Sequence, residues 1–423
     1  MTKTNKNIPE KIRSFFLAIL FLSLPFSVAG DDFAITGLYL VTFYLLFTKK
    51  DKWENKPLLY AMGLFLFGAI LSSLFSGDIL NSFAYFRSFW RFGLPFLIFL
   101  SFKKRDYLPY LRMVIVVSSL IGIYSVFQSF TGIDIFRSET MQKGYVSNQG
   151  VWNAVGLFSH HLTYGGVSLL LFGLFAPNCF NRQFSKVDRI LFTVGSLLNL
   201  AAVVVCMGRS IWLGTLVTII FIVSFLLGWR KSVLVLGVGL VIVVGLFSMS
   251  GEKYQSMLNS SVRGRRITSI LSTQQNQDRL MMWKSAIDMI KDQPIIGLGP
   301  NSGERMLPYY QQVAKKHNHK FQHQPGVGVH NIYLQNWLNF GLLGILGYFS
   351  IWLVLMVEGV KNIWRKSISY SKENSLILGI MAGMAGSMTA GVFENNFRDG
   401  EVQAVIFVIM GLVMVFIDRK VKK

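Results

Sequence analysis

The chain is poor in charged residues, and this shortage excludes an ordinary soluble domain. Only 15% of its 423 residues are charged, whereas soluble proteins average about 25%. Hydrophobic residues make up 52%, and the mean hydropathy is +0.46. The composition therefore predicts an all-α polytopic membrane protein.

Cysteine is almost absent too, with Cys179 and Cys206 as the only two. The topology predicted below puts them on opposite sides of the membrane, so they cannot pair and no disulfide framework or metal-thiolate site is expected. Internal repeats and low-complexity linkers are also lacking. We expect one integrated membrane domain, with spans in residues 1–249 and 332–423 and a large external loop in residues 250–331.

Twelve apolar stretches approach the roughly 20 residues that a helix needs to cross a bilayer. The second and the last are short, and the first two could form a tight hairpin. The N-terminus resembles a signal peptide ending at Ser27-Val28-Ala29, but we expect an uncleaved span, because an even number of spans keeps the C-terminal tail inside. The stretches are residues 12–29, 33–48, 58–75, 84–101, 110–130, 161–177, 190–207, 210–228, 232–249, 332–360, 376–393 and 402–417.

Basic residues occur in every second connection, which places both termini in the cytoplasm by the positive-inside rule. Most of the net charge of +21 is explained in this way, so no nucleic-acid partner is expected. The outer segment 250–329 still carries eleven Lys and Arg residues. Because long loops escape that rule, these cations predict an anionic ligand or lipid headgroups.

A histidine, His330, opens the apolar helix that follows this outer loop. If residues 332–340 are helical, at about 100° per residue Gly341 and Gly344 return beneath His330. Small residues there allow a neighbouring helix to approach closely and fix the histidine. These residues alone leave a helix cap and a catalytic residue equally open.

Several ionisable side chains lie at the outer ends of the spans, where an unpaired charge is costly. The guanidinium fork suits a diphosphate. A histidine beside such cations tends to be neutral and can accept a proton, so His330 is a candidate general base for inverting, metal-independent glycosyl transfer. These arginines also have purely structural interpretations. They could hold a tight outer turn, anchor a helix at the bilayer interface, or extend their charged ends to the headgroups. The arginines are Arg87, Arg91, Arg209 and Arg279, and Glu394 and Arg398 lie on the same side.

Other polar residues have structural interpretations. His160 and His161 are expected to cap the sixth span, and Asp31 and Asp32 to cap the second rather than bind a metal. The run His317, His319, His323 has no evident acidic partner, so zinc is not expected. Residues 278–291 form an amphipathic pattern that we expect to lie along the bilayer interface.

Together these residues resemble the O-antigen ligase and polymerase superfamily of bacterial envelope enzymes. The superfamily motif is His, then Asn, Ser or Gln, nine residues, Gly, two residues, and Gly, Thr or Tyr, and this chain matches it with His330, Asn331, Gly341 and Gly344. Further likenesses are the Gly208-Arg209-Ser210 turn, the helix from Asp278-Arg279 to Trp283, and Phe158-Ser159-His160. His160 is followed by His161-Leu162 where many relatives have proline or asparagine and small residues, so no catalytic role is assigned to it.

The resemblance implies a fold of about twelve spans like that of class C glycosyltransferases, in the bacterial inner membrane. It implies an undecaprenyl-diphosphate-linked glycan as donor at the periplasmic face and a hydroxyl of the lipid A core as acceptor, without metal or cofactor. Arg209 and Arg279 would bind the diphosphate and His330 would act as base. A polymerase that joins lipid-linked repeat units is an alternative. A lipid-linked glycan transporter is another, but its polar groups should lie near the bilayer midplane.

Overall fold

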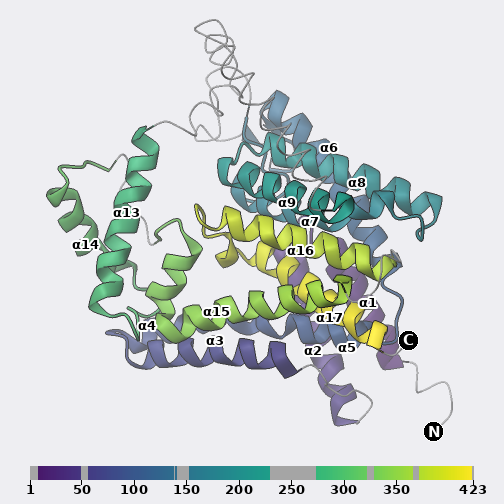
Figure 1. The fold of residues 1–423 in the computed structure, drawn as a ribbon, viewed down its shortest axis with the longest axis horizontal. Coiled ribbons are helices and arrows are strands. Elements are labelled where there is room, and N and C mark those ends of the chain that lie inside the picture. Colours follow the sequence, from purple (N-terminus) through teal and green to yellow (C-terminus); the bar gives the residue numbers. More distant parts are fainter. Residues whose placement is uncertain are drawn as a thin grey trace, which may run out of the picture.

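The computed structural model describes residues 8–48, 56–137, 139–140, 152–228, 273–321, 328–364 and 371–421. In these segments the chain is a helical bundle with one short β-hairpin (Figure 1). The membrane-protein class predicted from composition is confirmed.

The bundle helices run from α1 to α9 and from α15 to α17, while α13 and α14 lie between them in sequence. Short 3-10 segments and the strand pair β1–β2 complete the structure. The elements are α1 (Ile8–Ser23), α2 (Val28–Phe47), α3 (Lys56–Leu74), α4 (Ile79–Ala84), η2 (Tyr85–Gly93), α5 (Leu94–Phe102), α6 (Leu108–Thr131), β1 (Ile133–Asp134), β2 (Glu139–Thr140), α7 (His161–Phe175), η4 (Ala176–Phe180), α8 (Lys186–Val205), α9 (Arg209–Leu227), α13 (Thr273–Asp292), α14 (Gly303–Lys316), α15 (Ile332–Trp364), α16 (Lys372–Ala390), η6 (Asn396–Arg398) and α17 (Gly400–Val421).

Eight helices of the described segments are long and apolar enough to cross a membrane. They correspond to eight of the twelve predicted apolar stretches. The stretch 84–101 is not one helix but η2 followed by the nine-residue α5. The first stretch gives the 16-residue α1, and the eleventh, in α16, is not among the eight. The stretch 232–249 lies outside the described residues. The last stretch is longer than predicted, because α17 has 22 residues.

The most buried helices form the centre of the bundle. In α7 and α17, 83% of the apolar window is buried inside the protein, against 33% in α9. Helix α16 packs on α7 and α9, α3 packs along α15, and α17 packs on α5. Small residues permit this close packing: a Cβ on Gly173 would come within 2.5 Å of the Gly383 Cα.

Contacts between distant segments define the two ends of the bundle. At one end Arg112 Nε donates to Asp188 Oδ1 at 2.7 Å and Asn181 Nδ2 to the Ser371 carbonyl, and Arg112 belongs to one of the basic clusters predicted to be cytoplasmic. The start of α1 and the end of α17 lie at this end, on the right of Figure 1, and α13 and α14 cross the opposite end. We call the latter the loop end.

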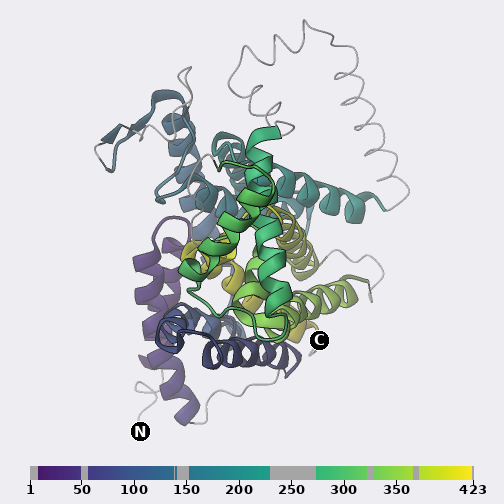
Figure 2. The ribbon, with the colours of Figure 1, turned by 90° about the vertical axis from the view of Figure 1, so that its left-hand side faces the viewer.

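Helix α13 crosses the loop end, but its apolar face is not free to meet lipid. Met282, Ala286 and Ile290 are buried in a cluster with α14 and α15. Figure 2 shows α13 and α14, both in green, lying side by side. The segment after α13 folds back over part of the face that was expected to lie along the bilayer interface. Ile287, by contrast, remains 43% exposed.

Helix α2 begins earlier than predicted, at Val28, and packs against α1 as a helical hairpin. Its N-cap is Ser27, whose Oγ accepts the Gly30 N–H at 3.1 Å. The expectation that Asp31 or Asp32 caps this helix is wrong, because both lie inside it. Instead, Asp31 accepts a hydrogen bond from Ser23 Oγ at 2.6 Å.

Candidate functional site

His330 precedes α15 in a strained backbone conformation. Its φ is +48°, in the left-handed region that costs a residue other than glycine about 1–3 kcal/mol. The helix cap is not His330 but Asn331, whose Oδ1 accepts the backbone N–H groups of Tyr333 and Leu334, both at 3.0 Å. The cap interpretation of His330 is therefore wrong, and its ring, 52% exposed, is available for contacts at the loop end.

The residue before the histidine is tied to two different helices. Val329 is fully buried; its N–H donates to Gln335 Oε1 at 3.0 Å, and its carbonyl accepts from Trp283 Nε1 at 3.1 Å. Gln335 lies in α15 and Trp283 in α13. The His330 backbone is thus held from both sides.

Glu394 lies between His330 and Arg279, in the turn after α16. Its Oε1 is 2.5 Å from Arg279 Nη2, its Oε2 is 3.5 Å from His330 Nδ1, and its side chain is 6% exposed. Burial alone would raise the pKa of Glu394, but its contact with His330 and the charge of Arg279 outweigh burial and hold the pKa below its usual value. A carboxylate, and not only the predicted cations, therefore faces this side of the site, because Glu394 contacts the His330 ring.

Arg209 and Arg279 line one pocket, which we call the apolar pocket. It has a volume of about 570 Å³. Arg209 is the first residue of α9, and Arg279 comes from α13, so tertiary packing brings together residues far apart in sequence. The rest of the wall is formed by Ser210 and by apolar side chains, namely Trp212, Leu213, Leu216, Leu280, Trp283 and Phe393.

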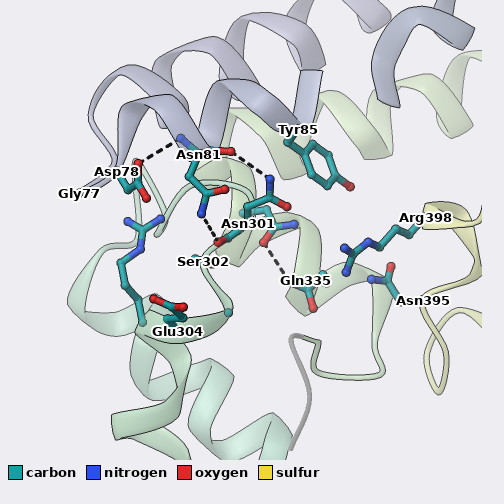
Figure 3. Close-up of a pocket in the computed structure, with 13 residues that line it drawn as sticks. Gly77, Asp78, Asn81, Tyr85, Asn301, Ser302, Glu304, Gln335, Asn395 and Arg398 are labelled. Carbon is teal, nitrogen blue, oxygen red and sulfur yellow. Dashed lines mark hydrogen bonds between the residues drawn. The ribbon is translucent and has the colours of Figure 1, made fainter. Parts of the chain in front are cut away.

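A second cavity, which we call the polar pocket, has a volume of about 790 Å³ (Figure 3). Phe393 lines the apolar pocket and Asn395 the polar one, so consecutive residues of one turn serve both. Sequence reasoning did not find the polar pocket. It is lined by Gly77, Asp78, Asn81, Tyr85, Asn301, Ser302, Gly303, Glu304, Arg305, Gln335, Asn339, Asn395 and Arg398.

Arg87 and Arg91 line neither pocket, so their predicted place beside the other two arginines is wrong. Arg91 is buried, and its guanidinium donates to Asp32 Oδ1, with Nε at 3.0 Å. Arg87 is exposed at the surface, where Nε donates to the Ala84 carbonyl at 3.2 Å. Asp32 had not been predicted as a partner because it is 59 residues from Arg91.

Gly341 and Gly344 do not continue one helical face below His330. The backbone breaks at Gly341, where φ is 66° and ψ is −168°. The segment before α14 passes this break: Leu342 N–H donates to the Ile295 carbonyl at 3.0 Å. Gly344 contacts a neighbouring helix, because a Cβ on Gly68 of α3 would lie 2.4 Å from the Gly344 nitrogen. Gly341 thus allows a loop to approach the backbone, and Gly344 allows helix α3 to approach.

Three of the other histidines, His160, His161 and His319, have structural contacts. His160 is the N-cap of α7, as predicted, and accepts the Leu162 N–H through Nδ1 at 3.3 Å. His161 Nδ1 lies 2.7 Å from the Cys206 carbonyl oxygen. His319 has an acidic partner after all, since its Nε2 is 2.6 Å from Asp278 Oδ1, and His323 lies outside the described residues.

Within the described segments no three metal-ligating side chains form a cluster, and both cysteines are free. The fold and the two pockets define a polytopic membrane protein with a charged site at one end of its bundle.

Residues 194–349 match the family model described as O-antigen ligase, so the chain carries a domain of that family. The domain is shared by O-antigen ligases and polymerases, which are glycan-transferring enzymes acting on lipid-linked glycans. No curated protein matches the chain. The matched region includes Arg209, Arg279 and His330, but it ends before Glu394 and Arg398.

Proposed function

We propose that this protein is an O-antigen ligase that moves a glycan from undecaprenyl diphosphate to a hydroxyl of the lipid A core oligosaccharide. The observation that carries the proposal is the pairing of Arg209 and Arg279 in one apolar pocket, beside the contact between Glu394 and His330. A polyprenyl diphosphate needs an apolar wall and a cationic end, and this pocket offers both.

The charges of the pocket suit a diphosphate leaving group. Arg209 and Arg279 each present several N–H donors, and the uncapped N-terminus of α9 adds partial positive charge. Nη2 of Arg279 is bound to Glu394, and its other guanidinium nitrogens remain for the ligand. Charge that develops on the departing diphosphate is thereby stabilised without a metal ion.

His330 supplies the proton acceptor in this mechanism. Because Nδ1 faces Glu394, Nε2 is the ring nitrogen turned to the acceptor. The acceptor oxygen attacks the anomeric carbon, its proton passes to Nε2, and the bond from the anomeric carbon to the phosphate oxygen breaks, which inverts the configuration. Glu394 then stabilises the imidazolium that forms.

The proposed location is the bacterial inner membrane, with both termini cytoplasmic and the site at the periplasmic face. Support comes from Arg112, a member of a predicted cytoplasmic basic cluster, which pairs with Asp188 at the end of the bundle opposite the two pockets. Membrane lipids would surround the exposed apolar side chains of the spans, such as Leu120, Leu197 and Leu353.

Reconstitution of the purified protein with a lipid-linked glycan tests the proposal. We expect product only when lipid A core is added. Longer glycans formed from the donor alone would instead identify a polymerase. Movement of the donor across the membrane without a new glycosidic bond would overturn the enzymatic function.

A further inference from the structure

The proposed function leaves the polar pocket without a role, although it is the larger of the two cavities described above. We propose that the polar pocket is the binding site for the acceptor, and that its ligand is a largely uncharged saccharide. The inference rests on the proposed glycosyl transfer, and it adds where the acceptor binds and what chemistry recognises it.

The wall of the pocket offers donors and acceptors of hydrogen bonds in comparable numbers. Carboxamide side chains, which do both, come from α4, α15 and two loops, and the charged groups are two carboxylates and two guanidinium groups. An anion site would hold mainly donors and a cation site mainly acceptors. A sugar hydroxyl donates and accepts at once, so a polyhydroxylated ligand fits this wall best.

Two arginines of the pocket have bonding capacity left over. One buried guanidinium nitrogen of Arg305, Nη2, has no hydrogen-bond partner among the described residues, which is costly unless a ligand supplies one. The Arg398 side chain is exposed, extends into the cavity beside Asn395, and makes no side-chain hydrogen bond within the described segments (Figure 3). Tyr85 adds an aromatic surface between these elements.

The position of the pocket relative to His330 assigns it to the acceptor rather than to the donor lipid. Val329 is bonded on one side to Trp283 of the apolar pocket and on the other to Gln335 of the polar pocket. His330, the next residue, lines neither cavity but directly follows a residue bonded to a wall of each. An inverting transfer needs the attacking hydroxyl and the leaving diphosphate on opposite sides of the anomeric carbon, and two separate cavities on the two sides of Val329 suit that arrangement. The volume of about 790 Å³ is within the range of about 300–1,000 Å³ usual for ligand sites.

Binding of a free oligosaccharide to the full-length protein tests the inference. The probe is lipid-free core oligosaccharide prepared from the lipopolysaccharide of the source bacterium, and its Kd is measured by saturation-transfer NMR titration. Arg398→Gln and Glu304→Gln change exposed side chains on different elements of the pocket, so both variants should fold. We expect each to raise the Kd about tenfold, as the loss of charge-assisted hydrogen bonds predicts. Arg182→Gln, an exposed arginine near the opposite end of the bundle, is the matched control and should leave the Kd unchanged.

The same titration with the glycan released from the donor separates the two substrates. If Arg398→Gln weakens the binding of the donor glycan but not the binding of the core oligosaccharide, the acceptor assignment is overturned. Equal core binding by wild type and both pocket variants would overturn the saccharide site itself. The inference and the proposed function can fail separately. His330-dependent transfer together with an unchanged acceptor KM in the pocket variants would overturn the inference and leave the proposed function standing. Conversely, pocket-dependent core binding can persist in a protein that transfers nothing.

Discussion

Arg279 and Glu394 form an ion pair across 115 residues of sequence, with Nη2 and Oε1 2.5 Å apart and both side chains largely shielded from water. The pair joins α13, which crosses the loop end, to the turn that follows α16. It also fixes the carboxylate so that its other oxygen faces His330. The proposed donor site and the proposed base are thus linked through one residue.

Replacing the proposed base should stop transfer without removing donor binding. We expect His330→Ala to lower kcat by about 10²–10⁴, the usual contribution of a general base. Undecaprenyl diphosphate should bind with nearly the wild-type Kd, because the apolar pocket is lined by other side chains. Single-turnover transfer of a radiolabelled glycan, with equilibrium binding beside it, measures both. Unchanged transfer would remove His330 from the mechanism.

Glu394→Gln keeps the shape of the side chain but removes its charge. We expect kcat to fall about 10-fold to 100-fold with little change in acceptor KM, because the imidazolium loses its counter-charge. Since the pKa of Glu394 is lowered, the carboxylate should stay ionised and active in the wild type down to pH values below its ordinary range. The pH profile of kcat separates this from a folding defect: a uniform loss of folded protein would scale activity equally at every pH.

Two of the four predicted arginines should contribute to donor binding, and two should not. Arg209→Gln and Arg279→Gln are expected to weaken undecaprenyl diphosphate binding by about 10-fold to 100-fold each, through the loss of charge-assisted hydrogen bonds. Arg87→Gln is the control, since that side chain is exposed and outside both pockets. Arg91→Gln should instead lower the thermal stability, because it leaves Asp32 without its partner. Equal donor Kd values for all four variants would contradict the assignment.

Asp399 should make the free energy of unfolding depend on pH near neutrality. Burial raises its pKa to about 6, and the hydrogen bond from Thr163 opposes this only in part. A raised carboxyl pKa destabilises the folded protein above that pKa, and the penalty disappears as the pH falls toward the unfolded value near 4. Asp399→Asn should therefore stabilise the protein by about 1–3 kcal/mol at pH 8 and hardly at all at pH 4. Thermal unfolding at both pH values tests this, and equal stabilisation at the two would refute the titration.

The break in α15 should tolerate no side chain. A Cβ on Gly341 would lie 2.0 Å from the Ile295 carbonyl oxygen, and φ there is +66°. We expect Gly341→Ala to lower the free energy of unfolding by more than about 2 kcal/mol. Gly63→Ala in α3 is the matched control, because nothing lies within 4 Å of its Cβ position, and it should be neutral or stabilising. Similar melting temperatures for the two variants would show that the strain at Gly341 is relieved.

The sequence by itself determined the class of the protein and much of its local chemistry. Composition and the length of the apolar stretches depend on transfer from water to lipid, which is a property of each segment, so the membrane class and eight of the spans could be read directly. The close approach of another segment to Gly341 and Gly344 and the capping by His160 could be anticipated from short-range patterns. The matched domain, residues 194–349, also contains the residues singled out from their motifs.

Only the tertiary structure decided which charges meet. Arg91 turned out to pair with Asp32, and Glu394 to stand between Arg279 and His330, because pairing depends on distances between residues that are far apart along the chain. The same holds for the end of the helix at Gly341, where a distant loop competes for the backbone, and for the apolar face of α13, which α14 covers. Periodicity reports that a face is apolar, but not whether lipid or protein covers it, and packing alone settles that choice.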